Sequence, residues 1–243
     1  MRDDFAAFIL THGRPDNVKT YNTLRRGGYT GRIVILIDDT DDTAPHYRDK
    51  FGGQVEVFSK ADIAARFDTG DNQADMRTIV YARNACFEVA ARLGIGFFVQ
   101  LDDDYYEMNY RFTADDLWIH RDYAIKSLDS VFGSLLNFLE SSGVSTVAMS
   151  QGGDYIGGPQ SKAGGAIMMT RKAMNSFFCA TDRPIGFLGR INEDVNTYTR
   201  KASTGCVMLS TTQAWLNQIS TQESTGGMTD VYVSSGTYTK SFY

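Results

Sequence analysis

Short apolar runs recur along the chain and are separated by longer stretches in which apolar residues fall three or four positions apart. The short runs predict buried β-strands at residues 5–10, 32–37, 55–58 and 97–101. The longer stretches predict helices at 16–26, with Asp16 as the N-cap, and at about 72–93. Strands that alternate with helices predict an α/β fold with a largely parallel sheet and right-handed crossovers.

Polar side chains directly follow three of these strands. His12 and Arg14 come after the first strand, Asp38 and Asp39 after the second, and the triplet Asp102–Asp104 after the fourth. In a sheet of this kind, ligands bind at the carboxyl ends of the strands. The sequence therefore predicts a ligand site at this edge.

The three adjacent aspartates are a costly group at a buried strand end unless a cation or hydrogen-bond donors neutralise them. If the chain stays extended there, Asp102 and Asp104 point the same way and share one ion, while Asp103 points elsewhere. Oxygen ligands of this type suit Mg²⁺ or Mn²⁺. The alternative is an acidic turn at a solvated strand end.

The helix before the triplet carries Arg83 in the middle of its apolar stripe. An arginine there needs an anionic partner or a route for its charge to reach water. Three interpretations stay open: a stem packed on the core with an exposed charge, an ion pair with one of the aspartates, or a contact with a ribose or diphosphate.

Length and composition indicate one large domain. The chain has 243 residues, 42% of them hydrophobic, and no Pro/Ser-rich or low-complexity linker divides it. The cysteines form no metal-ligand motif and suggest a reducing compartment. There is no run of about twenty apolar residues and no signal peptide, so we expect a cytoplasmic protein without membrane contact, in the host cytoplasm if the chain is viral.

The net charge of −5 argues against a general nucleic-acid coat but leaves a local basic face open. The basic residues that we consider for such a face are scattered along the sequence. They are Arg25, Arg26, Arg32, Lys172, Arg190, Arg200, Lys201 and Lys240.

Several motifs together resemble the nucleotide-sugar-dependent glycosyltransferases of the GT-A fold. They are Thr11-His12-Gly13-Arg14-Pro15 after the first strand, the acids after the second, Ala82-Arg83-Asn84, the DxD motif at Asp102 to Asp104, the segment 164–171 and Asn192-Glu193-Asp194. The resemblance runs from residue 5 to about 210. It implies a Rossmann-like sheet within a single domain, 1–243, with a nucleotide-binding half at about 1–104 and an acceptor-binding half at about 105–243.

A narrower resemblance concerns the first sixty residues. The run from Gly13 to Thr20, together with Gly28-Tyr29-Thr30-Gly31, is similar to the phage TET-associated glycosyltransferases, which are connected with sugar transfer to 5-hydroxymethylcytosine in viral DNA. It implies a UDP-sugar as donor and double-stranded DNA containing 5-hydroxymethylcytosine as acceptor.

On the donor side, the resemblance implies that Asp38 or Asp39 meets the uracil base. Arg14 and Arg83 would approach the ribose or diphosphate, and the neighbouring His12 and Asp103 are included in the same nucleotide site. Asp102 would face the ribose or a water of the ion. Asp104, with Asp102, would bind Mn²⁺ or Mg²⁺.

On the acceptor side, the resemblance places Glu193 and Asp194, where a carboxylate takes the proton of the attacking hydroxyl. Asp194 is our choice for the base if the reaction inverts the anomeric centre. An acidic first helical turn that complements the helix dipole is the plainer interpretation of both residues.

The chain departs from the family pattern in one respect. Many GT-A enzymes complete the metal site with a histidine near the C-terminus, whereas the histidines here are His12, His46 and His120. Asp230 is a possible substitute.

Other functions stay open at this point. They are a glycosyltransferase with a non-DNA acceptor, a sugar nucleotidyltransferase, and a non-catalytic nucleotide-binding or Ca²⁺-binding module built on Asp38 to Asp42. The sequence leaves the donor sugar, the stereochemical outcome and the oligomeric state undecided.

Overall fold

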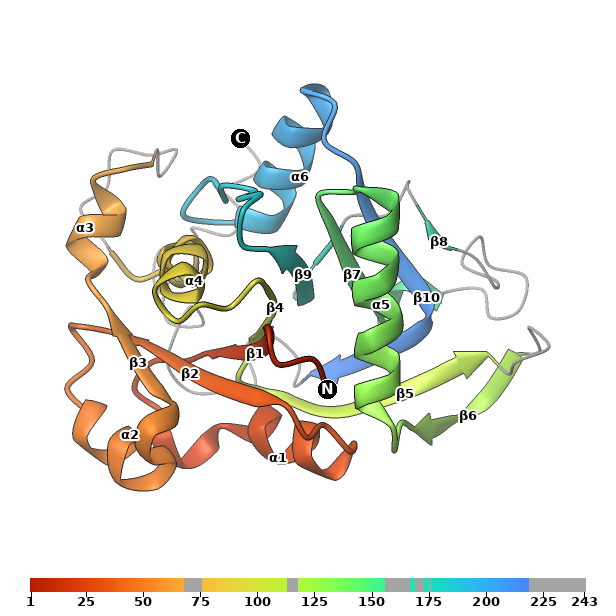
Figure 1. The fold of residues 1–243 in the computed structure, drawn as a ribbon, viewed down its shortest axis with the longest axis horizontal. Coiled ribbons are helices and arrows are strands. Elements are labelled where there is room, and N and C mark those ends of the chain that lie inside the picture. Colours follow the sequence, from red (N-terminus) through yellow and green to blue (C-terminus); the bar gives the residue numbers. More distant parts are fainter. Residues whose placement is uncertain (68–75, 113–117, 156–166, 169–172, 175, 219–243) are drawn as a thin grey trace.

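A central sheet with helices on both faces forms the body of the protein. The computed structural model describes residues 1–67, 76–112, 118–155, 167–168, 173–174 and 176–218. Within these residues, ten strands form one sheet (Figure 1). In this part of the chain, no helix has the length and apolar character needed to cross a membrane.

The sheet is parallel in one half and mixed parallel and antiparallel in the other. Its strands are β1 (Phe5–Leu10), β2 (Arg32–Asp38), β3 (Val55–Phe58), β4 (Phe97–Asp102), β5 (Tyr105–Phe112), β6 (Trp118–Ala124), β7 (Thr146–Gln151), β8 (Ile167–Met168), β9 (Ser176–Ala180) and β10 (Met208–Gln218). Their order is β3-β2-β1-β4-β9-β7-β10-β5-β6, with β8 beside β10. The first four are parallel, as predicted, whereas β9 runs antiparallel to β4 and β5 antiparallel to β10. The predicted α/β fold is confirmed.

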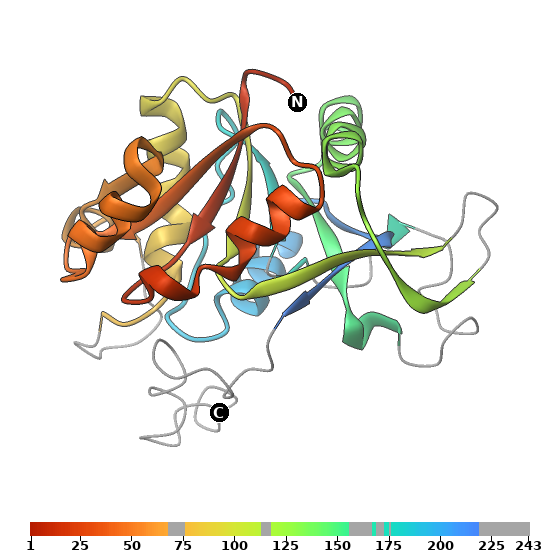
Figure 2. The ribbon, with the colours of Figure 1, turned by 90° about the horizontal axis from the view of Figure 1, so that it is seen from below.

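The helices divide between the two faces of the sheet. They are α1 (Lys19–Arg26), α2 (Ala44–Phe51), α3 (Lys60–Ala64), α4 (Val80–Arg92), α5 (Leu128–Ser142) and α6 (Glu193–Ser203), with 3-10 turns η1 (Pro15–Asn17), η2 (Gly52–Gln54) and η3 (Gly152–Tyr155). Helices α1, α2 and α5 pack on the face to which Phe5, Ala7 and Ile9 of β1 point. Helices α3, α4 and α6 pack on the face of the alternate residues. Accordingly, α1 and α4 lie on opposite sides of β1 (Figures 1 and 2).

The register of the parallel strands brings their carboxyl ends together. Leu10 of β1 is paired with Asp102 of β4, and Asp38 of β2 with Phe58 of β3. The loops that follow β1, β2, β3 and β4 therefore emerge at one edge, where the sequence predicted a ligand site.

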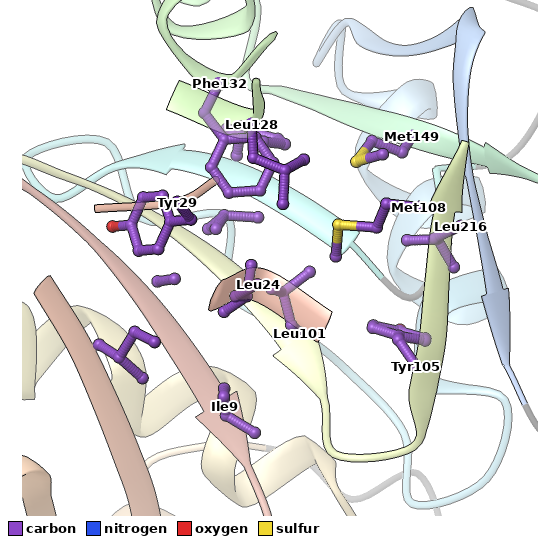
Figure 3. Close-up of a cluster of buried hydrophobic side chains, with 14 of the residues drawn as sticks. Ile9, Leu24, Tyr29, Leu101, Tyr105, Met108, Leu128, Phe132, Met149 and Leu216 are labelled. Carbon is purple, nitrogen blue, oxygen red and sulfur yellow. The ribbon is translucent and has the colours of Figure 1, made fainter. Parts of the chain in front are cut away.

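A buried tyrosine fixes the turn after β4. Tyr105 follows the three aspartates and lies in the core with Leu101, Met108 and Leu216 (Figure 3). All four side chains are at most 3% exposed. Because this core is packed around Tyr105, the preceding turn has little freedom to move.

The helix start predicted at Asp16 was wrong, and the described residues just before Val80 are not helical. Asp16 lies inside η1 instead of capping a helix, and α1 begins at Lys19. Asp16 instead contacts Lys50 across the surface. Helix α4 begins at Val80, because the Thr78 hydroxyl accepts the Val80 N–H and ends the irregular segment before it. Residue 72, the predicted start, lies outside the described residues.

Candidate active site

The aspartate triplet forms a turn, so the side-chain alternation of an extended chain stops at Asp102. Thr20 of α1 holds this turn in place with three hydrogen bonds. Its hydroxyl donates to the Asp102 carbonyl at 2.6 Å and accepts the Tyr105 N–H at 3.0 Å. Its backbone N–H donates to the Asp103 carbonyl at 3.1 Å. The predicted alternation was wrong for this reason. Metal binding by Asp102 and Asp104 stays a prediction.

Asp103 is buried and ties the turn to the loop after β1. Its Oδ2 accepts the Thr11 hydroxyl at 2.6 Å, and its Oδ1 accepts Nη2 of Arg14 at 2.9 Å. Tyr47 extends this network, because its hydroxyl bonds to the Thr11 hydroxyl at 2.7 Å and accepts the Arg14 N–H at 2.9 Å. Asp103 and Arg14, both predicted nucleotide contacts, are thus brought together by a direct ion pair.

Asp104 has the arrangement expected of a cation ligand. Its Oδ1 is buried and has no hydrogen-bond partner among the described residues. Burial, followed by the charges of Asp102 and Asp103, raises the pKa of Asp104 to about 7. An unpartnered oxygen in a surplus of negative charge fits a divalent cation. Within the described residues, no three Asp, Glu, His or Cys side chains gather as a metal site, and Asp230 lies outside them.

Arg83 connects the triplet to the start of α6. Its Nη2 donates to Asp102 at 3.0 Å, and its Nε donates to Glu193 at 3.0 Å. Of the three interpretations from sequence, the structure shows the ion pair. Contact with a ribose or diphosphate stays a prediction. Burial raises the pKa of both Asp102 and Glu193, and the Arg83 charge opposes the rise.

Glu193 and Asp194, the acidic pair, are the first two residues of α6. Asn192 before it has a left-handed backbone, with φ of 54°, which turns the chain sharply into the helix. Asp194 is 9% exposed, and its Oδ1 accepts the N–H of Val195 at 2.8 Å. Among the described residues, no donor is found for the other oxygen, Oδ2, which leaves Asp194 with acceptor capacity.

Asp38 and Asp39, at the end of β2, bind the basic residues His12 and Lys60. Nδ1 of His12 bonds Oδ2 of Asp38 at 2.8 Å, and Nζ of Lys60 lies 3.0 Å from the same oxygen. Oδ1 of Asp38 accepts both the N–H and the hydroxyl of Thr40. Burial alone would raise the pKa of Asp38, but these donors hold it well below its usual range. Exposed Asp39 accepts the Lys60 N–H at 3.0 Å.

Asp38 therefore has no acceptor site to spare. A carboxylate offers about four lone-pair positions, and these four donors use them. Asp41 is engaged in the same way by Gly13 and Thr43. Both carboxylates are thus occupied by protein donors, unlike the free ligands that a Ca²⁺ loop needs.

A cavity of about 340 Å³ opens beside His12 and Lys60. Its polar side chains come from the loop after β1, the end of β2, the start of α3 and the segment before α4, and its apolar side chains come from β3 and the start of α4. The lining residues are Thr11, His12, Arg14, Asp38, Phe58, Lys60, Arg77, Thr78, Ile79 and Ala82. A pocket with apolar walls and a few charged groups suits a nucleoside.

Comparison with protein families decides the class. The family model described as TET-Associated Glycosyltransferase matches residues 5–227. The chain belongs to this family. Membership of the TET-associated glycosyltransferase family agrees with the motifs read from the sequence.

Comparison with individual proteins adds less. No curated protein matches the chain. Among the matching solved structures is TarS of S. aureus, residues 1–349, with 11% sequence identity and a TM-score of 0.49. The match covers 87% of the present chain and 59% of that one.

Sequence reasoning missed several residues of the candidate site. Thr11 and Lys60 follow the first and third predicted strands, so the same rule that selected Asp38 would have found them. Tyr47 carries no such signal, because a helical tyrosine is an ordinary core residue. Segment 164–171 is described only at Ile167–Met168, which forms the short strand β8.

The ion pair with Asp38 leads to a pH prediction. The hydrogen bond to Asp38 raises the pKa of His12 above 6.5. NMR titration of the imidazoles should show this, and Asp38→Asn should lower the His12 value, whereas Asp42→Asn in the same loop should not. The ion pair stabilises the fold below about pH 6.5, and this contribution is lost as pH rises through the folded-state pKa. A His12 that titrates like free histidine contradicts the arrangement.

Proposed function

We propose that this enzyme transfers a sugar from a UDP-sugar to the hydroxyl of 5-hydroxymethylcytosine in double-stranded DNA. The observation that carries the proposal is the position of the acidic turn, Asp102–Asp104. It adjoins the nucleoside-sized cavity through Arg14, which lines that cavity and bonds Asp103. The cavity can take a nucleoside, and Arg14 beside it supplies a positive charge for a diphosphate.

The nucleoside part would enter the cavity. Phe58, Ile79 and Ala82 offer apolar walls to the base, while His12 and Lys60 offer donors. Lys60 uses two of its three donor hydrogens, on Asp38 and Thr40, and retains one for a ligand. Asp38 lines the cavity and acts by fixing these two side chains, whereas Asp39, the other acid predicted to meet uracil, is exposed and does not line the cavity.

The diphosphate would meet the acidic turn. Mn²⁺ or Mg²⁺ would be bound by Asp104 together with Asp102 and would neutralise the leaving diphosphate. Arg14 supplies a fixed positive charge next to it, because Asp103 orients its guanidinium. The chain's own contribution is thus a pre-arranged set of charges that needs little reorganisation during the reaction.

The acceptor hydroxyl would approach Asp194. A carboxylate at this position takes the proton as the hydroxyl attacks the anomeric carbon. Glu193 is less suited to this role because its Oε1 forms an ion pair with buried Arg83, whereas Oδ1 of Asp194 accepts a neutral backbone N–H. The base in this proposal is therefore Asp194, for an inverting reaction.

DNA as the acceptor is supported by the family and limits the choice of a binding face. A base in a duplex must be flipped out before its hydroxymethyl group becomes accessible. Arg200 and Lys201 lie in α6, the helix that begins with the acidic pair. Arg25 and Arg26 lie on α1, on the opposite side of the sheet (Figure 1). Arg190 is 2% exposed, so it was wrongly considered for this face. Lys172 and Lys240 lie outside the described residues.

Calorimetry with UDP tests the donor site. Asp38→Ala removes the carboxylate that positions His12 and Lys60, so the Kd for UDP should rise about tenfold or more. Asp42→Ala is the matched control, because Asp42 is an exposed acid of the same loop. An Asp38→Ala protein that is folded by its thermal melt and binds UDP as tightly as the wild type would mean that the cavity is not the donor site.

A further inference from the structure

Helix α4 and the residues just before it contact the segment that leads into Glu193 and Asp194 at several positions. The Thr78 hydroxyl donates to the Arg190 carbonyl at 2.7 Å. The Asn84 amide makes two bonds with the backbone of Phe187, donating at 3.0 Å and accepting at 2.8 Å. Between these positions, Arg83 reaches Glu193 itself. The start of α6 and the segment before it are therefore attached to α4 and its preceding residues at Phe187, Arg190 and Glu193.

Arg83 extends this attachment to the donor side. Its two bonded nitrogens point to carboxylates of different elements, Asp102 at the end of β4 and Glu193 at the start of α6. The guanidinium lies 5.0 Å from the ring centre of Phe177 and 5.9 Å from that of Phe187. These rings and the two ion pairs fix the plane of the group.

The Arg83 guanidinium is too buried for a nucleotide to reach it. Arg83 is 1% exposed, and its remaining nitrogen, Nη1, is also buried and has no hydrogen-bond partner in the part of the chain that the structure describes. A substrate phosphate would have to displace one of the carboxylates to reach it. Arg83 and Asn84 of the motif thus join two parts of the protein.

We propose that Arg83 is a positioning residue that fixes the acceptor-side pair, Glu193 and Asp194, against the donor-side turn at Asp102. This proposal rests on the proposed function, in which Asp194 is the base and the turn faces the diphosphate. Arg83 acts through the two carboxylates and does not bind the donor. Its effect is on the geometry of the reacting groups, so its loss lowers turnover rather than substrate affinity.

Arg83→Lys is the sharpest variant. It keeps the positive charge, but a single ammonium lacks the planar, two-directional donors that reach both carboxylates. Arg92→Lys is the matched control, because Arg92 lies on the same helix and forms an exposed ion pair with Glu56. We expect kcat for transfer to fall about 100-fold in Arg83→Lys. The Kd for UDP in metal-free buffer should change by less than about threefold. Arg92→Lys should match the wild type.

Unchanged kcat in Arg83→Lys would overturn the proposal. So would a loss of UDP affinity as large as the loss of kcat, since that result would make Arg83 a donor ligand. If Arg83→Lys fails to fold, Glu193→Gln serves instead, because it weakens one ion pair and leaves Asp194 intact. It should also lower kcat without affecting UDP affinity, and a Glu193→Gln protein with wild-type kcat would count against the proposal.

Amide hydrogen exchange separates failure of this proposal from failure of the proposed function. The first turn of α6 should exchange faster in Arg83→Lys than in Arg92→Lys, while α5 exchanges equally in both. This measurement needs no substrate. If the wild type transfers no sugar to DNA but the exchange differs as expected, the DNA assignment fails and the attachment stands. Equal exchange in the two variants overturns the attachment itself.

Discussion

Asp104→Asn should abolish nearly all sugar transfer while leaving the fold intact. Asn retains the size of the side chain but removes the negative charge that would face the cation. Loss of one charge-stabilising group of this kind lowers kcat by about 10²- to 10³-fold. The measurement is the initial rate of transfer with saturating donor and Mn²⁺.

Stability serves as the control for Asp104→Asn. Because Asp102 and Asp103 repel the Asp104 charge, its removal should not lower the melting temperature in metal-free buffer. Asp182→Asn is the matched variant, since the Asp182 side chain is 87% exposed and distant in sequence from the turn. Wild-type turnover by Asp104→Asn, or full activity of the wild type in excess EDTA, would contradict metal binding at Asp104.

Asp194→Asn should lose transfer by about 10²- to 10⁴-fold, the usual contribution of a general base. It should bind UDP with nearly the wild-type Kd, because the residue lies at the start of α6 and does not line the nucleoside cavity. Calorimetry with UDP and the rate of transfer, measured on the same preparation, separate these effects.

Asp62→Asn is a suitable comparison for Asp194→Asn, because Asp62 is an exposed acid in the first turn of α3. It should leave both measurements unchanged. If Asp194→Asn weakens UDP binding as much as it lowers the rate, the division into donor and acceptor sides is wrong. Undiminished transfer would mean that Asp194 is not the base and would favour a retaining reaction.

The strands of the donor half could be predicted from the sequence because each is a short apolar run with polar residues directly after it. The parallel register then brings those polar residues together without further information. This logic placed His12, Asp38 and the aspartate triplet at one edge. It failed inside the triplet, because Asp103 and Asp104 form a turn that Thr20, more than eighty positions away, holds in place.

The partners of the charged residues could not be predicted. An arginine in an apolar stripe indicates a nearby anion, but Glu193, one of its two partners, is 110 positions along the chain. Only the packing of α6 on the same face as α4 brings them together. Likewise, Asp38 looked like a free ligand in the sequence, and the structure shows its acceptor sites filled by His12, Lys60 and Thr40.

Mass spectrometry of DNA tests the central claim most directly. Matched duplexes with 5-hydroxymethylcytosine and with ordinary cytosine are incubated with the protein, Mn²⁺ and a panel of UDP-sugars, then digested to nucleosides. We expect a mass gain of one sugar on 5-hydroxymethylcytosine alone, with one UDP-sugar preferred. Donors that are hydrolysed without any mass gain on either duplex would contradict DNA as the acceptor.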